Sequence, residues 1–219
     1  MQAEWLKKKG NGTLVLFFNG WGMEPWVVGH LKGEEDILAF SDYRTLEIEE
    51  EALRGVDNYA RVYVVAWSMG VWAAANVLRN WALPLRGTVA LNGTERPVDD
   101  TVGIPEKVYL LTERGMNPRG RERFVARMLG DAEEKERFKA HPLCRELPEL
   151  CEELVKIREQ CAVARQVWTW DKVYISRQDV IFPPDNQQHW WYGRAKEIRF
   201  LPGAHYPFYH FQSWEEILS

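Results

Sequence analysis

The stretch RVYVVAWSMGVWAAANVL, residues 61–78, constrains the fold more than any other part of the sequence. A continuous apolar run ends at Ser68, and Gly70, three alanines and further apolar residues follow it at helical spacing. Continuous apolar runs are typical of strands that are covered on both faces. The stretch therefore predicts a buried strand, a tight turn at Ser68 and a helix, which together begin a parallel strand–helix–strand unit.

Similar apolar runs recur on both sides of a charge-rich central segment. They predict strands at 13–20, 35–44, 61–68, 87–94, 172–176 and 195–201. Helices are predicted at 69–81, 185–193 and 213–218. Because strands and helices alternate, the expected fold class is α/β, with a mostly parallel central sheet that is flanked by helices.

The central segment, residues 99–167, interrupts this alternation with helical patterns. Helices are predicted at 105–115, 117–130 and 147–167, although KVYLL within the first of them also fits a strand. We therefore expect a core of residues 1–98 and 168–219, into which a helical lid of residues 99–167 is inserted.

Composition and charge exclude several classes of protein. A chain of 219 residues fits one domain of ordinary size, and its net charge of −4 does not indicate nucleic-acid binding. The apolar runs are too short to cross a bilayer, and MQAEWLKKKG lacks the apolar segment of a secretory signal, so no membrane association is expected. The odd set Cys144, Cys151 and Cys161, without a CxxC motif, favours reduced thiols in the cytoplasm and no metal site.

Ser68 is a candidate nucleophile. A serine that ends a parallel strand and opens a helix is exposed at the carboxyl edge of the sheet, where ligands bind in such folds. The usual pattern around it is G-x-S-x-G, because the tight turn admits only small neighbours. Here the pattern runs from Ala66 to Gly70, with alanine in the first position. A serine that merely caps the helix is the alternative interpretation.

Two later residues favour the nucleophile. A serine hydroxyl needs a histidine to take its proton, and the histidine needs a carboxylate to hold its tautomer. In this architecture the chain order is Ser, then Asp or Glu, then His. Asp179 follows the strand KVYIS, and His205 follows the strand AKEIRFL and a Pro-Gly turn. Their order and positions predict a Ser68–Asp179–His205 triad.

The same chemistry needs two backbone N–H groups that face the developing oxyanion. One comes from the residue after the nucleophile, Met69, and the other from the loop after an early strand. That loop is FFNGWGM, in which Gly20 and Gly22 permit a sharp reversal and leave the N–H of Trp21 free. An ordinary Asn-Gly turn is the alternative. Trp21 and Trp67 are expected either to line a substrate slot or to pack in the core.

The sequence resembles a known family across nearly its whole length, from Leu16 to Phe208. LFFNGWGM, VAWSMGVWAA, LNGT, GIP and SRQDVIFPPDNQ…GAHYPF together look like the pimeloyl-acyl-carrier-protein methyl ester esterases of the BioG type. Many related esterases carry His-Gly in the early loop, whereas this chain has Asn19-Gly20, which fits the BioG-type variation. The resemblance implies an α/β-hydrolase with a helical lid, and the nucleophile, acid, base and oxyanion roles for Ser68, Asp179, His205, Trp21 and Met69.

By the same resemblance, the reaction is hydrolysis of the methyl ester of pimeloyl-acyl-carrier protein, without a cofactor, on the route to biotin. The carrier protein is then a transient partner, and because it is acidic its docking surface should be basic. The segment 114–127 has five arginines against the single acid Glu122, namely Arg114, Arg119, Arg121, Arg123 and Arg127. A solvated helix face that pairs with Glu133, Glu134 and Glu136 is the alternative for these arginines.

Two other functions remain open from the sequence. A broader carboxylesterase or thioesterase would carry the same triad, because the scissile bond leaves no mark in the sequence. A non-catalytic relative that only binds an acyl ligand is the second, although such relatives usually lose a triad member.

Overall fold

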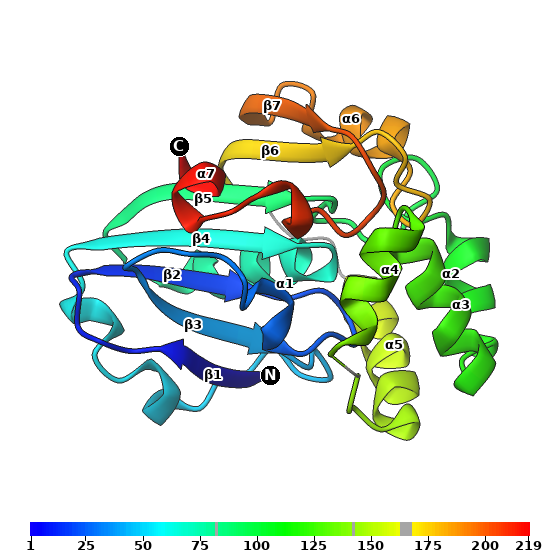
Figure 1. Cartoon of the computed structure of the whole chain (residues 1–219), viewed down its shortest axis with the longest axis horizontal. Coiled ribbons are helices and arrows are strands. Elements are labelled where there is room, and N and C mark those ends of the chain that lie inside the picture. Colours follow the sequence, from blue (N-terminus) through cyan, green and yellow to red (C-terminus); the bar gives the residue numbers. More distant parts are fainter. Residues whose placement is uncertain (82, 142, 163–167) are drawn as a thin grey trace.

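A seven-stranded sheet forms the centre of the computed structural model, which describes residues 1–81, 83–141, 143–162 and 168–219 (Figure 1). The strand order is β1-β3-β2-β4-β5-β6-β7, and every neighbouring pair is parallel except β1 and β3. The strands are β1 Gln2–Lys7, β2 Thr13–Phe18, β3 Asp36–Ser41, β4 Arg61–Trp67, β5 Leu85–Leu91, β6 Trp170–Ser176 and β7 Ala195–Leu201.

Burial explains why most strands were predictable and one was not. Leu14 to Phe18 in β2 are all fully buried, as their continuous apolar run predicts. The antiparallel edge strand β1 instead alternates exposed Gln2 and Glu4 with half-buried Ala3 and Trp5. Such alternation is typical of a strand with one solvated face, so β1 was not among the predicted buried strands.

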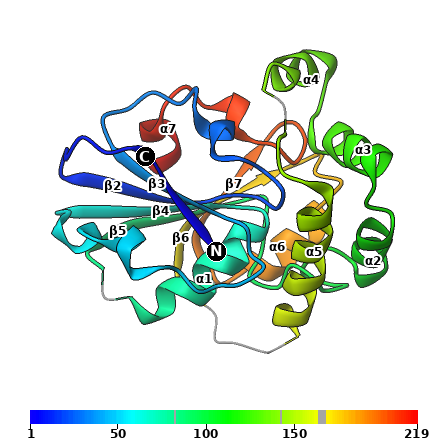
Figure 2. The same ribbon diagram turned by 90° about the horizontal axis from the view of Figure 1, so that it is seen from below.

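Helices cover both faces of the sheet. The helix α1, Met69–Val77, lies on one face and α7, Trp214–Leu218, on the other (Figures 1 and 2). The helix α6 spans Pro184–Trp191. Single-turn 3₁₀ helices connect the elements: η1 Pro25–Val28, η2 Glu50–Leu53, η3 Val56–Asn58, η4 Leu78–Asn80 and η5 Phe208–His210. The predicted helix 69–81 therefore ends earlier, at Val77, and continues as η4.

Four helices gather at the carboxyl ends of the strands, and we call them, together with the described residues that connect them, the helical cap (Figure 1). They are α2 Glu106–Arg114, α3 Pro118–Met128, α4 Ala132–Lys139 and α5 Leu147–Cys161. The segment KVYLL lies in α2, so the preference for helix there was correct. The predicted helix 147–167 is confirmed up to Cys161, and its residues 163–167 lie outside the described residues.

The helix α4 was not predicted because its sequence is almost entirely charged. Only Phe138 is buried among its eight residues, so no apolar period marks it. It begins instead at a cap, where the side chain of Asp131 accepts a hydrogen bond from Glu134 N. Across the described residues, none of the helices combines the length and the apolar character that crossing a membrane requires.

Candidate active site

Ser68 lies in a strained turn between β4 and α1. Its backbone has φ 59° and ψ −124°, a conformation that residues with a side chain rarely adopt outside functional sites. The turn admits no side chain at two neighbours, because a Cβ on Gly70 would lie 2.2 Å from Phe18 O and one on Gly93 would lie 2.3 Å from Ser68 O. Ala66 is fully buried in the strand, where its methyl group is accommodated.

The three residues of the predicted triad lie together at the carboxyl edge of the sheet. Ser68 Oγ is 2.9 Å from Nε2 of His205, and Nδ1 of the same ring is 2.8 Å from Oδ2 of Asp179. All three residues are almost completely buried, with exposures of 5% for Ser68, 1% for His205 and 3% for Asp179. This arrangement can pass a proton from the serine hydroxyl to the imidazole while the carboxylate faces the other ring nitrogen.

Three donors besides His205 hold the carboxylate of Asp179. The backbone N–H groups of Ile181 and Phe182 donate to Oδ1 at 2.8 and 2.9 Å. Gln187 Nε2, on α6, donates to Oδ2 at 3.1 Å and to Phe182 O at 2.7 Å. Sequence reasoning missed Gln187, and a polar residue on the apolar side of the DNQQHWW helix was the one signal available.

The loop that carries His205 is fixed by its backbone carbonyl. Asn92 Nδ2 donates to His205 O at 2.9 Å, and Trp67 Nε1 donates to the same oxygen at 3.0 Å. The side chain of Asn92 also makes two hydrogen bonds to Ser176: Nδ2 donates to Ser176 Oγ, and Oδ1 accepts from Ser176 N. These bonds join the carboxyl ends of β5 and β6. Asn92 stands in the LNGT motif, but nothing in the local sequence marks it as an asparagine that pairs across strands.

The position of Trp67 distinguishes between the two alternatives that the sequence left open. Its ring is 1% exposed and packs against His205, Phe208 and the backbone of Gly20, where an added Cβ would come within 2.9 Å of it. It lies outside the walls of the cavity at Ser68. The indole therefore packs beneath the loop that carries His205, on its core side. Of the two roles considered for Trp67, the structure favours core packing.

Trp21 and Met69 border the same cavity as Ser68. No hydrogen bond among the described residues engages the backbone N–H of Trp21, and Met69 opens α1, where the first N–H groups have no acceptor within the helix. Asn19 closes the loop around Trp21, since its side chain accepts from Gly20 N and donates to Met23 O, both at 2.9 Å. Two free donors therefore border the serine.

The cavity at Ser68 is narrow, with a volume of about 30 Å³, and its walls are mainly apolar. Val108 and Thr112 of α2 and Phe124 and Arg127 of α3 separate it from a second cavity of about 200 Å³. The second cavity extends between α2 and α3 and is also bordered by Arg123. In the part of the chain that the structure describes, no cluster of three or more His, Cys, Asp or Glu is placed to hold a metal ion.

The arginines of the expected docking patch lie on the cap. Arg114 ends α2 and the others lie on α3; all are exposed except Arg121, which is half-buried. Arg121 Nη1 donates to Arg145 O and Arg127 Nη2 donates to Val180 O, each at 3.1 Å. Two of the three acids that were the alternative partners are engaged elsewhere, because Glu136 pairs with Lys139 and Glu134 accepts from Gly130 N.

Known proteins resemble this chain at the level of sequence and structure. A family model described as "Pimeloyl-ACP methyl esterase BioG" matches residues 1–217. A malonyl-[acyl-carrier protein] O-methyltransferase of Bacteroides fragilis is 39% identical over 194 residues, which are 88% of this chain but 39% of that protein. This chain thus spans well under half the length of that relative.

Solved structures agree with the family match. The crystal structure of BioG from Haemophilus influenzae superposes with a TM-score of 0.89 and 31% identity over 100% of both chains. MGS-M2, an alpha/beta hydrolase enzyme from a Medee basin deep-sea metagenome, superposes with a TM-score of 0.63 over 93% of this chain and 86% of that one. At 14% identity the second match concerns the fold alone. The chain has the α/β-hydrolase fold and belongs to the BioG family of pimeloyl-ACP methyl esterases.

Proposed function

We propose that this protein is a cytoplasmic serine esterase that hydrolyses the methyl ester of pimeloyl-acyl-carrier protein in biotin biosynthesis. The products are methanol and pimeloyl-acyl-carrier protein with a free ω-carboxylate. The observation that carries the proposal is the continuous line of hydrogen bonds from Asp179 through His205 to Ser68, which ends in an apolar cavity. Membership of the BioG family supports the choice of substrate.

In the first half of the proposed reaction, Ser68 Oγ attacks the carbonyl carbon of the methyl ester. His205 takes the hydroxyl proton on Nε2, and Asp179 stabilises the resulting imidazolium through Nδ1–H. The carbonyl oxygen becomes an oxyanion, which the N–H groups of Trp21 and Met69 stabilise. His205 then returns the proton to the leaving oxygen, so that methanol departs and an acyl ester remains on Ser68.

In the second half, water replaces methanol. His205 takes a proton from the water, whose oxygen attacks the acyl carbonyl and forms a second oxyanion at the same two N–H groups. The bond to Ser68 Oγ breaks, and the proton returns to the serine. The free carboxylate then leaves while the other end of the acyl chain remains on its carrier.

The shape of the cavities supports an apolar acyl chain as the bound group. The cavity at Ser68 and the second cavity share the wall residues Val108, Thr112, Phe124 and Arg127. An extended chain that continued from the serine into the second cavity would therefore run between α2 and α3. That path ends among the exposed arginines of α3, which include Arg123. A basic exit suits a chain that is attached to an acidic carrier protein.

Turnover of methyl pimeloyl-acyl-carrier protein by the wild type and by Ser68→Ala tests the proposal. We expect the wild type to release methanol and Ser68→Ala to lose about 10⁶-fold in kcat, since the hydroxyl supplies chemistry and little core volume. Thermal unfolding of both proteins checks that the fold is retained. A Ser68→Ala variant that keeps more than a tenth of the wild-type rate would exclude Ser68 as the nucleophile.

Two further measurements separate the other functions considered. Equal turnover of the methyl ester and of the carrier thioester would indicate a broader esterase or thioesterase. A wild-type protein whose Ser68 takes no fluorophosphonate label, and which still binds the acyl-carrier substrate, would indicate a non-catalytic acyl-binding protein.

A further inference from the structure

The loop that carries Trp21 is attached to the cap by direct hydrogen bonds. Trp21 Nε1 donates to Leu150 O of α5 at 3.2 Å. Glu24 Oε1 accepts from the backbone N–H groups of Cys144 and Arg145, at 2.6 and 3.0 Å, in the segment before α5. The loop thus contacts the cap through the indole of Trp21 and through the carboxylate of Glu24.

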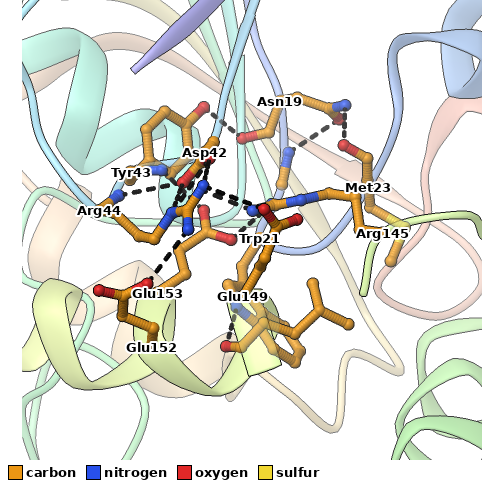
Figure 3. Close-up of polar contacts among 12 residues, drawn as sticks. Asn19, Trp21, Met23, Asp42, Tyr43, Arg44, Arg145, Glu149, Glu152 and Glu153 are labelled. Atoms are coloured by element: carbon orange, nitrogen blue, oxygen red, sulfur yellow. Dashed lines mark hydrogen bonds and ion pairs between the residues drawn. The ribbon is translucent and has the colours of Figure 1, made fainter. Parts of the chain in front are cut away.

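A third attachment runs through a buried ionic cluster, which we define as Asp42, Arg145 and Glu153 (Figure 3). Glu153 of α5 is fully buried, and its Oε2 lies 2.6 Å from Nη1 of Arg145. Nη2 of Arg145 lies 3.4 Å from Oδ1 of Asp42, just beyond β3. Burial raises the pKa of Glu153, and the guanidinium of Arg145 opposes that shift.

Tyr43 joins this cluster to the loop. Its backbone N–H donates to Glu153 Oε1 at 2.8 Å, and its fully buried hydroxyl donates to Asn19 O at 2.6 Å. Asn19 is the residue whose side chain closes the turn from Gly20 to Met23. Figure 3 shows the resulting line from α5 through Glu153 and Tyr43 to Asn19.

The energetic character of the cluster suggests a role other than stability. A buried ion pair often contributes little net stability compared with apolar residues of the same shape, because both charges lose their hydration. What such a pair does supply is a geometry that tolerates little displacement, since moving one charge leaves the other buried and unpaired. Here that geometry fixes the position of Tyr43 and, through it, the carbonyl of Asn19.

We propose that Arg145 and Glu153 of the cap are positioning residues, which act through Tyr43 and Asn19 to hold the N–H of Trp21 where the oxyanion forms. The cap then completes the oxyanion site in addition to covering the acyl chain. This inference rests on the proposed function, because it takes Trp21 as an oxyanion donor.

Two variants test the proposal with little disturbance of the fold. Tyr43→Phe removes only the hydroxyl that bonds Asn19 O. Glu153→Gln keeps the size of the side chain but has one acceptor oxygen where the carboxylate accepts from both Tyr43 N and Arg145 Nη1. One of these two donors then faces an NH₂ group, while Arg145 keeps Asp42 as its partner. Glu159→Gln is the matched control, because Glu159 lies on the same helix, its side chain is 51% exposed and it pairs with Lys156 of α5 and not with the cluster. Thermal unfolding confirms that each variant is folded.

The assay uses p-nitrophenyl acetate, a small ester that does not need the carrier protein. We expect Tyr43→Phe and Glu153→Gln each to lower kcat by roughly tenfold or more, short of the 10²–10³-fold lost when an oxyanion donor is removed outright. KM should stay unchanged, since the oxyanion exists only in the transition state. Inhibition by a trifluoromethyl ketone, whose adduct with Ser68 carries an oxyanion, should weaken by a similar factor. Glu159→Gln should match the wild type.

A kcat within twofold of the wild type in folded Tyr43→Phe would overturn the proposal, whether or not Glu153→Gln folds. A loss confined to carrier-bound substrate would also overturn it, because the cluster would then serve docking. Failure of the proposed function would look different, since the wild type itself would hydrolyse neither ester, and the positioning role would fall with it.

Discussion

At the scale of single residues, the carboxylate of Asp179 depends on a side chain from α6 that sequence reasoning missed. Gln187 is fully buried, and its Nε2 donates to the carboxylate oxygen that faces His205. The partners fix the orientation of the amide, because the carboxylate and Phe182 O are both acceptors. Gln187 therefore keeps Asp179 aligned with the imidazole.

We predict that Gln187→Met lowers kcat by roughly tenfold and leaves KM nearly unchanged. The change keeps the volume of the side chain but removes one charge-assisted hydrogen bond to Asp179, which is worth about 1.5–3 kcal/mol. Steady-state kinetics on p-nitrophenyl acetate measure the effect. Gln188→Met is the matched control on the exposed side of α6. Equal kcat values for the two variants would remove Gln187 from the catalytic arrangement.

At the scale of elements, Glu95 fastens the segment after β5 to the start of β6. It accepts hydrogen bonds from Trp168 N at 3.0 and 3.1 Å and from Trp170 Nε1 at 2.8 Å. Burial nevertheless raises the pKa of Glu95 from 4.5 to about 7. Between these two pH values the folded protein therefore holds a proton that the unfolded chain releases, so Glu95 makes the fold less stable as pH rises.

We predict that Glu95→Gln becomes more stable relative to the wild type as pH rises from 5 to 8. The neutral amide can still accept from Trp170 and has no ionised form to bury. The difference in unfolding free energy should grow by roughly 2 kcal/mol over this range and then level off. Urea unfolding of both proteins at each pH measures it. A constant difference across the range would show that Glu95 does not titrate in the folded state.

At the scale of the whole molecule, the exposed arginines of the cap are distinct from the buried residues around Ser68. Arg119 and Arg123 are exposed on α3, whereas Arg121 bonds Arg145 O within the cap. A docking test should therefore reverse the first two and spare Arg121. Arg61 and Arg86 give a matched control, because both are exposed at the beginning of their strands, at the opposite edge of the sheet.

We predict that Arg119→Glu with Arg123→Glu lowers kcat/KM for carrier-bound substrate at least about tenfold at low salt. The wild-type value should fall as salt rises, and the double variant should lose that dependence. Hydrolysis of p-nitrophenyl acetate should change little, as should every rate of the Arg61→Glu, Arg86→Glu control. Equal slowing of both substrates would mean that the arginines maintain the cap, and no slowing would mean that the carrier docks elsewhere.

The sequence alone determined the features that depend on local patterns. Continuous apolar runs identified the buried strands, and the turn at Ser68 required small neighbours in any fold that contains it. The order of Ser68, Asp179 and His205 then predicted which strand ends should meet, because parallel strands share one carboxyl edge. In the structure His205 lies within hydrogen-bond distance of both Ser68 and Asp179.

Only the tertiary structure decided which distant residues support that site. Gln187, Asn92 and the cluster of Asp42, Arg145 and Glu153 are polar residues that have partners eight to more than one hundred positions away in the chain, besides nearer ones. A buried polar side chain must find such partners, but the sequence does not record which ones packing brings within reach. The sequence left Trp67 either in a slot wall or in the core for the same reason, because its apolar ring suits both places. In the structure it packs against His205 and donates a hydrogen bond to His205 O.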